Sequence, residues 1–311
     1  AGELVPGDIV LLEAGDRIPA DARVLDAHAA EVAEAALTGE SQAVAKTPEA
    51  VAENSALAER RGMVFMNTVV TRGRLEAIVV ATGWRPYDAK KLDTLGFGRF
   101  PNVITNVMME RLASRNGPTE GKILRPSDKK PVKSVIFAQC AGSRDENHLA
   151  YCSGVCCLAS MKEASFVLEQ NPDAKIKIFY IDIRTPGRYE QFYWKVRDDE
   201  NVHLIRGKVA KITQEPGTDN VVVVAENTAT GDKESQVFDM VVLAAGMVPS
   251  TKASPFPLPL SYTPDGFVIQ DLLPPGVYAV GTLKGPLDVT KSVQDGTGAA
   301  LKSLIALGRR S

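Results

Sequence analysis

The sequence has no cysteine outside residues 140–157, no excess of either charge and no long apolar run. Its 36 basic and 38 acidic residues nearly cancel, so the total charge indicates neither a nucleic-acid partner nor a membrane surface. No apolar run approaches the roughly 20 residues that a membrane-spanning helix needs. The first ten residues lack the basic region and apolar run of a signal peptide, and they lack a starting Met. We therefore expect a cytoplasmic location, no membrane span, and a fragment of a longer protein.

A complete dinucleotide-binding fingerprint is also missing. That fingerprint, Gly-x-Gly-x-x-Gly between a strand and a helix, holds a pyrophosphate at the helix N-terminus. Gly96-Phe97-Gly98 is followed by Arg-Phe-Pro, and Gly296-Thr297-Gly298 lacks the third glycine. Neither lies between a predicted strand and a predicted helix, so we interpret both as ordinary glycine turns.

The sequence contains three histidines, His28, His148 and His203. None has a second potential ligand at a workable spacing. We interpret all three as surface or hydrogen-bonded residues and not as metal ligands.

All four cysteines lie close together, at Cys140, Cys152, Cys156 and Cys157, in the spacing C-x11-C-x3-C-C. Such clustering is typical of a ligand set, because thiolates select soft metals such as zinc or the iron of an iron–sulfur cluster. Zinc sites commonly use paired C-x2-4-C knuckles, in which adjacent cysteines are unusual. The pattern therefore favours an iron–sulfur cluster over zinc.

Two interpretations without a metal remain open. Two disulfides are disfavoured, because nothing indicates an oxidising compartment and a chain of 311 residues needs no covalent staples. Four separately buried thiols are the other alternative, since a free cysteine packs as a small apolar residue.

The segments Cys140–Glu146 (CAGSRDE) and Tyr151–Cys157 (YCSGVCC) carry a family resemblance. They resemble the A-type subunit of heterodisulfide reductase and, more closely, the A-type subunit of the quinone-interacting membrane-bound oxidoreductase of sulfate reducers. The resemblance runs from about Ile78 to the C-terminus. It implies a [4Fe-4S] cluster held by the four cysteines, a nearby FAD, and other redox subunits as partners.

The same resemblance implies which residues lie near the flavin. The closing segment from Gly276 to Gln294 matches the family, with Gly281-Thr282 where related enzymes usually have Gly-Asp. The implied flavin neighbours are Thr82, Gly83, Gly281, Thr282, Asp288 and Ser292. Because the pyrophosphate-binding turn is missing, we expect FAD to bind weakly or not at all.

The first quarter of the chain resembles something else. Pro-Gly-Asp at 6–8, Gly-Asp-Arg-Ile-Pro-Ala-Asp at 15–21 and Thr-Gly-Glu-Ser at 38–41 stand in the order found in the actuator domain of P-type ATPases, a distorted jelly roll. The resemblance implies that Glu40 positions a water for hydrolysis of an aspartyl-phosphate. The sequence contains no Asp-Lys-Thr-Gly-Thr phosphorylation motif, so we do not expect ATPase activity.

The pattern of apolar runs and turn residues predicts an α/β domain in the second half. It predicts these strands: Leu75–Gly83, Lys133–Gln139, Lys175–Ile183, Val202–Thr213, Val221–Asn227, Glu234–Phe238 and Met240–Ala245. Helices are predicted at Val103–Leu112 (helix or loop), Val155–Gln170, Tyr189–Arg197, with its aromatic residues facing the core, and near Val289. In addition, the sequence of Ile78–Pro86 is similar to that of Val241–Pro249. This similarity is expected if two nested dinucleotide-binding halves each return through the same kind of strand and turn.

We therefore predict a mixed fold, in which an all-β actuator-like part joins a truncated two-domain flavoprotein. The expected domains are an actuator-like domain (1–77), an FAD-domain segment (78–130), a dinucleotide-binding-like domain with the cysteines (131–250) and a C-terminal FAD-domain segment (251–311). The leading functional hypothesis is electron transfer between FAD and a cysteine-ligated cluster. The alternatives are an actuator fragment of a cation-transporting ATPase and a fusion without integrated activity.

Overall fold

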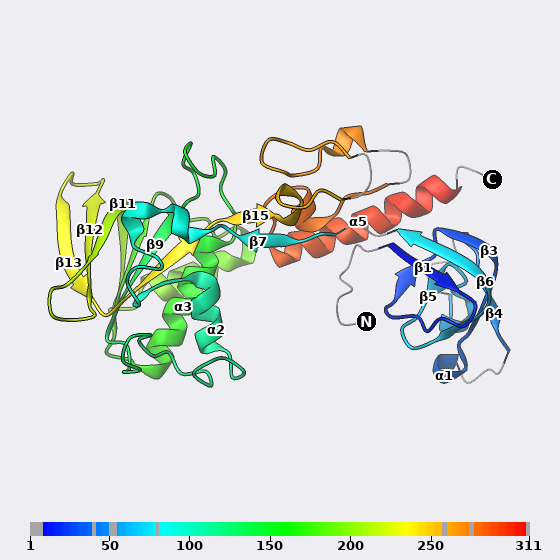
Figure 1. Cartoon of the computed structure of the whole chain (residues 1–311), viewed down its shortest axis with the longest axis horizontal. Coiled ribbons are helices and arrows are strands. Elements are labelled where there is room, and N and C mark those ends of the chain that lie inside the picture. Colours follow the sequence, from blue (N-terminus) through cyan, green and yellow to red (C-terminus); the bar gives the residue numbers. More distant parts are fainter. Residues whose placement is uncertain are drawn as a thin grey trace. The chain divides into compact units, whose positions relative to one another are not determined.

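The computed structural model describes residues 9–38, 42–49, 55–78, 81–256, 260–273 and 277–308. The chain divides into two compact units, which are described separately. One contains Ala1–Trp84 and Pro249–Ser311, and the other contains Arg85–Val248 (Figure 1).

The N-terminal part of the first unit is antiparallel β-structure, as the sequence predicts. Its four-stranded sheet has the order β1 (Ile9–Glu13), β6 (Val69–Ile78), β3 (Asp26–Ala33), β4 (Val44–Ala45). A second pair joins β2 (Ala22–Arg23) and β5 (Met63–Val64), and the short helices are α1 (Ala35–Thr38) and η1 (Leu57–Glu59). Ile18, Val32 and Val70 are fully buried between these strands and form the centre of the core.

A buried ion pair crosses this small core. The side chains of Glu34 and Lys46 are both 0% exposed, and they pair directly. The Lys46 ammonium also lies 5.5 Å from the centroid of the Phe65 ring. Burial lowers the pKa of Lys46, while the hydrogen bond and charge of Glu34 raise it. Each charge depends on the other, because a lone buried charge is strongly destabilising.

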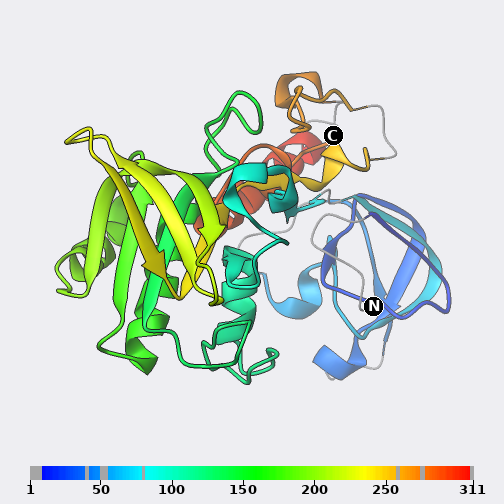
Figure 2. The same cartoon turned by 60° about the vertical axis from the view of Figure 1, so that its left-hand side comes forward.

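The second unit is built on a seven-stranded sheet in the order β13-β12-β11-β10-β9-β14-β8. The strands are β8 (Val103–Thr105), β9 (Ser134–Ala141), β10 (Lys175–Tyr180), β11 (Val202–Gln214), β12 (Val221–Asn227), β13 (Lys233–Phe238) and β14 (Met240–Ala245). Strands β8, β14, β9, β10 and β11 run parallel, and β12 and β13 continue the sheet as an antiparallel extension (Figure 2). This is the dinucleotide-binding type of sheet that the strand pattern predicts.

Each face of this sheet has its own core. Side chains alternate along a strand, so Val135 and Phe137 of β9 face the cluster formed with helices α2 (Asn106–Ala113), α3 (Cys156–Gln170) and α4 (Glu190–Arg197). Ile136 and Ala138 face the opposite cluster, which includes residues of η2 (Ala89–Lys91) and η3 (Asp93–Leu95). Packed side chains therefore cover both faces of the sheet.

Several predicted elements have different bounds. Val103–Thr105 forms the buried edge strand β8 and not helix, because it pairs with β14 in register Val241↔Val103. Strand β9 continues through Cys140 to Ala141, and β10 ends at Tyr180.

The prediction that the aromatic residues of α4 face the core is only partly right. Phe192 and Tyr193 pack against the helix-side core, but Tyr189 and Trp194 are 40% and 44% exposed. Trp194 instead stacks with Arg197, whose guanidinium lies 4.1 Å from the ring centroid. A cation–π contact at the surface keeps this ring outside the core.

The internal echo in the sequence corresponds to a pair of strands. β7 (Trp84–Pro86) and β15 (Met247–Pro249) form a two-stranded sheet, so the ends of the two similar segments pair with each other. The predicted strand Leu75–Gly83 is described only in part: β6 ends at Ile78, residues 79–80 lie outside the described residues, and residues 81–83 are not in a strand.

The remainder of the first unit is mostly irregular chain followed by a long helix. Three 3₁₀ turns, η5 (Ser250–Lys252), η6 (Gln270–Leu272) and η7 (Gly281–Leu283), precede α5 (Val289–Gly308). The helix begins where the sequence predicts it. Among the residues described, no helix combines the length and apolar character needed to span a membrane.

A buried acid joins α2 to α3 in the second unit. Asn106 donates from Nδ2 to Oε2 of Glu163 (2.6 Å) and to Oγ of Ser160 (3.3 Å). Glu163 is 0% exposed, and this burial, with the nearby Glu110 carboxylate, raises its pKa to about 9 against the opposing effects of Asn106 and Lys162. Glu163 is therefore protonated at neutral pH.

We expect Glu163→Gln to change how stability depends on pH. The ordinary carboxyl pKa is 4.5 and the folded value about 9, so between these values the unfolded chain loses a proton that the folded chain keeps. Stability of the wild type then falls as pH rises, by up to about 1.4 kcal/mol per pH unit. Urea unfolding at pH 5, 7 and 9 should show the variant gaining stability relative to the wild type as pH increases. Equal slopes for wild type, Glu163→Gln and the exposed control Glu169→Gln would contradict this assignment.

Candidate metal centre and flavin site

The first cysteine lies where β9 turns out of the sheet. Cys140 has φ +56°, a left-handed conformation that residues other than glycine seldom adopt. Gly142 follows with φ +77°, and a Cβ there would lie 2.7 Å from the Tyr87 ring. A strained non-glycine residue of this kind costs about 1–3 kcal/mol and is found mainly at functional sites. The parallel strands end at this edge, where open α/β sheets bind their ligands.

The loop after Cys140 is held by a hydrogen bond between two of its own hydroxyls and by two hydrogen bonds to Met247, the first residue of β15. The buried hydroxyls of Ser143 and Ser153 share a hydrogen bond of 3.1 Å. The Ser153 hydroxyl also accepts from the backbone N–H of Met247 (2.8 Å), and Tyr151 donates its hydroxyl to the Met247 carbonyl (2.7 Å). Cys152 therefore lies between two anchored residues, close to the end of β14.

The other two cysteines begin α3, as predicted. The thiol of Cys156 donates to the carbonyl of Ala245 (3.9 Å), and that of Cys157 donates to the carbonyl of Asp182 (3.7 Å). Ala245 is the last residue of β14, and Asp182 lies in the loop after β10. Strands β14 and β10 are the two neighbours of β9 in the sheet. The four thiols therefore come from three segments that meet at one edge of the sheet.

The four thiols influence one another electrostatically. Burial raises the pKa of Cys140 to about 11, and the charges of Cys157 and Cys152 add to the effect. Burial also raises the pKa of Cys156, again reinforced by the other three thiols. Burial raises the pKa of Cys157 as well, although a hydrogen bond from the backbone N–H of Arg184 opposes the change.

The donor set fits a thiophilic metal in its chemistry. All four cysteines are free thiols, two of them buried and two partly exposed, and four thiolates crowded together need a cation to balance their charge. Within the described ranges no three His, Cys, Asp or Glu side chains are already grouped as metal ligands. The thiols would therefore have to turn toward one another to share an ion or cluster. Their role as ligands stays a prediction.

The three histidines have ordinary surroundings. His148 shares a hydrogen bond of 2.8 Å between its Nδ1 and the hydroxyl of Tyr87. His28 lies with Nε2 3.2 Å from the carboxylate of Asp26, and His203 is exposed on β11. These positions agree with the interpretation of all three as surface or hydrogen-bonded residues.

A cavity beside Cys140 was not predicted from the sequence. It has a volume of about 620 Å³ and lies entirely within the second unit. Its walls come from the η2–η3 segment, the end of β9, and strands β11 and β12, including Leu92, Leu95, Ala138, Cys140, Lys208 and Val209. These residues are far apart in the sequence and share no motif, so no sequence pattern could have indicated the cavity.

The predicted flavin neighbours all belong to the first unit. Gly281 is buried, has φ +61°, and donates its N–H to the carboxylate of Asp295 (2.7 Å). Asp295 also pairs with Lys284. A Cβ on Gly281 would be 3.5 Å from that of Ser292, so the structure brings Gly281 and Ser292 together. Thr282 follows Gly281 in η7. Asp295 was missed because a single aspartate in a helix gives no pattern.

The remaining predicted positions have different local roles. Asp288 accepts the N–H of Lys291 (2.8 Å) and so caps the first turn of α5. Gly83 has φ +69° and accepts the N–H of Ser250 (3.2 Å). Among the described residues, the buried hydroxyl of Thr82 has no hydrogen-bond partner, which is uncommon for a buried polar group. Glu40 lies outside the described residues.

Comparisons with known proteins bear on both parts of the chain. Residues 1–88 match the P-type ATPase actuator domain family. An A-type iron-sulfur subunit of CoB–CoM heterodisulfide reductase from Methanopyrus kandleri is 39% identical over 243 residues, 74% of this chain and 37% of that protein. The A-type subunit of the H2:CoB–CoM heterodisulfide,ferredoxin reductase from Methanothermobacter marburgensis is 37% identical over 242 residues, with the same coverage of both proteins.

Among solved structures, thioredoxin reductase of Lactococcus lactis (FR conformation) aligns with a TM-score of 0.44 and 15% identity. The alignment covers 78% of this chain and 70% of that one.

The chain spans 37% of the length of the two curated relatives named above. The resemblance of the cysteine segments to the A-type subunit of heterodisulfide reductase and that of the Thr-Gly-Glu-Ser region to the actuator domain are both confirmed, whereas the closer resemblance to the quinone-interacting oxidoreductase stays a prediction. Residues 1–88 match the P-type ATPase actuator domain, and about three quarters of the chain is similar to the A-type subunit of heterodisulfide reductase, an oxidoreductase.

Proposed function

We propose that the second unit transfers single electrons through an iron–sulfur cluster held by Cys140, Cys152, Cys156 and Cys157. One observation supports this most directly: four thiols from three segments interact electrostatically at the carboxyl edge of a nucleotide-type sheet. A [4Fe-4S] cluster, when bound, supplies one-electron chemistry at potentials set by its surroundings. The names of the relatives, which denote single subunits of larger reductases, support other redox subunits as partners.

The residues of the chain have definite tasks in this proposal. The turn at Cys140 and the anchored loop around Ser153 hold two thiols against the start of α3, which supplies the other two. The carbonyls of Ala245 and Asp182 accept hydrogen bonds from the protonated thiols. Loading the site requires loss of the thiol protons, so binding should strengthen as pH rises. The domain bounds 1–77, 78–130, 131–250 and 251–311 are part of the proposal.

We expect Cys156→Ser and Cys157→Ser to abolish or strongly reduce binding of iron and sulfide. The wild type, isolated or reconstituted without oxygen, should contain about four irons and four acid-labile sulfides per chain and absorb broadly near 400 nm. Both variants remove a soft sulfur ligand at the first turn of α3. Ser165→Ala is the control, because Ser165 lies on the same helix and bonds to the carbonyl of Met161 one turn earlier (3.1 Å). A metal-free wild type would refute the electron-transfer proposal.

We propose further that the first unit retains a weak flavin site near Thr82, Gly83, Gly281, Thr282, Asp288 and Ser292. The left-handed Gly83 and Gly281 and the unpaired hydroxyl of Thr82 support a ligand approaching the backbone closely. Flavin, when bound, would exchange electrons in one- and two-electron steps and so could supply the cluster.

We expect Thr82→Val to separate flavin binding from stability. Removing a buried hydroxyl that has no partner should leave urea stability unchanged or slightly increased. If that hydroxyl bonds to the flavin, the same change should weaken FAD binding by about fivefold to tenfold, the usual effect of about 1 kcal/mol. Fluorescence titration with FAD measures the affinity, and Thr94→Val, in the second unit, is the control. Equal affinity for wild type and Thr82→Val would remove Thr82 from the site.

A second candidate function rests on the family match of residues 1–88. In this alternative, Glu40 accelerates hydrolysis of an aspartyl-phosphate held by another protein. Adding the chain to a P-type ATPase that lacks its actuator domain should then speed dephosphorylation, and Glu40→Gln should remove the effect. An unchanged rate would leave the actuator-like part without this activity.

A further inference from the structure

Two arginines flank the cysteines and share one carboxylate. The guanidinium of Arg144 pairs directly with Oδ1 of Asp182, and Nε of Arg184 lies 3.6 Å from the same oxygen. Arg144 belongs to the loop after β9, whereas Asp182 and Arg184 belong to the loop after β10. Because β9 and β10 are parallel neighbours, these loops meet at the edge of the sheet that holds the thiols.

These charges reach the thiol site through direct contacts. The carbonyl of Asp182 accepts the hydrogen bond of the Cys157 thiol (3.7 Å). The backbone N–H of Arg184 bonds to Cys157 and lowers its pKa against the effect of burial. Through Asp182, whose carbonyl bonds to the Cys157 thiol, both guanidinium groups are held beside the thiol site.

The arrangement has one net positive charge at neutral pH. An arginine side chain does not lose its proton in proteins. Two guanidinium groups and one carboxylate therefore have one uncompensated positive charge. The side chains of Arg144 and Arg184 are 26% and 51% exposed, so water and salt reduce but do not abolish their effect. The adjacent pair of Lys208 and Asp145, 3.0 Å apart, is neutral as a whole.

We propose that Arg144, Asp182 and Arg184, here called the charge clamp, stabilise the added electron on the thiol-bound centre and so raise its reduction potential. This inference rests on the proposed function. In the step concerned, one electron enters the centre, which becomes more negative by one charge, and no bond or proton changes. Asp182 restrains both guanidinium groups beside the thiols and partly offsets their charge.

A purely structural role makes a different prediction. Exposed ion pairs contribute only about 0–1 kcal/mol to stability. If the charge clamp only joined two loops, removing a charge would change stability slightly and leave the potential unaltered. Reduction potential is therefore a readout that separates the two roles.

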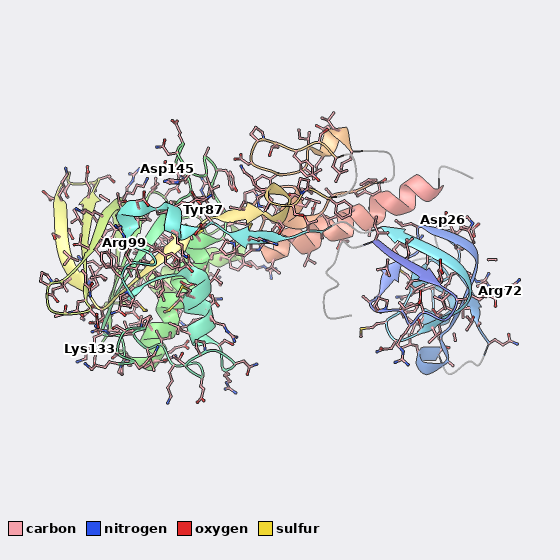
Figure 3. The ribbon with its side chains drawn as sticks, viewed as in Figure 1. Asp26, Arg72, Tyr87, Arg99, Lys133 and Asp145 are labelled. Carbon is pink, nitrogen blue, oxygen red and sulfur yellow. The ribbon has the colours of Figure 1, made fainter. Side chains whose placement is uncertain are left out.

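The test compares single-charge variants by redox titration monitored by electron paramagnetic resonance. Arg184→Gln should make reduction about threefold to tenfold less favourable, the latter being about 59 mV for a one-electron couple. Asp182→Asn removes a negative charge and should shift the potential in the opposite direction. The control is Lys133→Gln, which removes an exposed positive charge at the start of β9, the end opposite Cys140. Figure 3 shows Lys133 and Asp145 at opposite ends of this unit.

A second probe keeps the test independent of the iron–sulfur cluster. Co2+ bound to thiolates is also a centre of net negative charge, and its absorption reports affinity directly. Arg184→Gln should weaken Co2+ binding by about threefold or more, whereas Lys133→Gln should not. If no cluster forms but Co2+ shows this pattern, the electron-transfer proposal fails and the charge clamp stands. Unchanged potential and unchanged Co2+ affinity in Arg184→Gln would overturn the charge clamp, and so would a wild type that binds neither probe.

Discussion

Crowding of four thiols at one buried edge is the constraint on which the second unit depends. Burial raises the pKa of Cys140, Cys156 and Cys157, the neighbouring thiols add to the effect, and the nearby arginines Arg144 and Arg184 oppose it for Cys140 and Cys157 respectively. The thiols can therefore be negative together only if a positive centre or fixed cations compensate them. The left-handed turn at Cys140, the hydrogen-bonded hydroxyls of Ser143 and Ser153, and the start of α3 all hold the sulfurs in this unfavourable proximity.

The edge of the sheet that holds the cysteines can be compared with the corresponding edge in dinucleotide-binding proteins. In dinucleotide-binding proteins a glycine-rich turn after a β-strand holds a pyrophosphate at a helix N-terminus. Here Cys140 is the last residue but one of β9, Gly142 follows the strand, and the helix α3 begins with Cys156 and Cys157. The order of strand and helix is the same, but the loop 142–155 between them is long, and the side chains at its two ends are sulfurs.

Buried polar groups in different parts of the chain differ in the partners that they have. Glu34 and Lys46 satisfy each other inside the actuator-like core, and Glu163 is neutral and accepts a hydrogen bond from Asn106. Within the described residues the hydroxyl of Thr82 has no hydrogen-bond partner, and the same holds for Oε1 of Glu163 and for both amide atoms of Gln139. An unpaired buried polar group costs free energy, and Thr82 differs from the others because the left-handed Gly83 follows it.

The sequence by itself determined the positions of strands β9 to β14, the start of α3 at the paired cysteines, and both family resemblances. It could do so because these features depend on local periodicity and on residue spacing. Only the tertiary structure revealed the left-handed turn at Cys140, the cavity beside it, the partnership of Gly281 with Asp295, and the two arginines that share Asp182. Each of these joins residues from separate segments, and a linear pattern contains no information on which segments meet at one edge of a sheet.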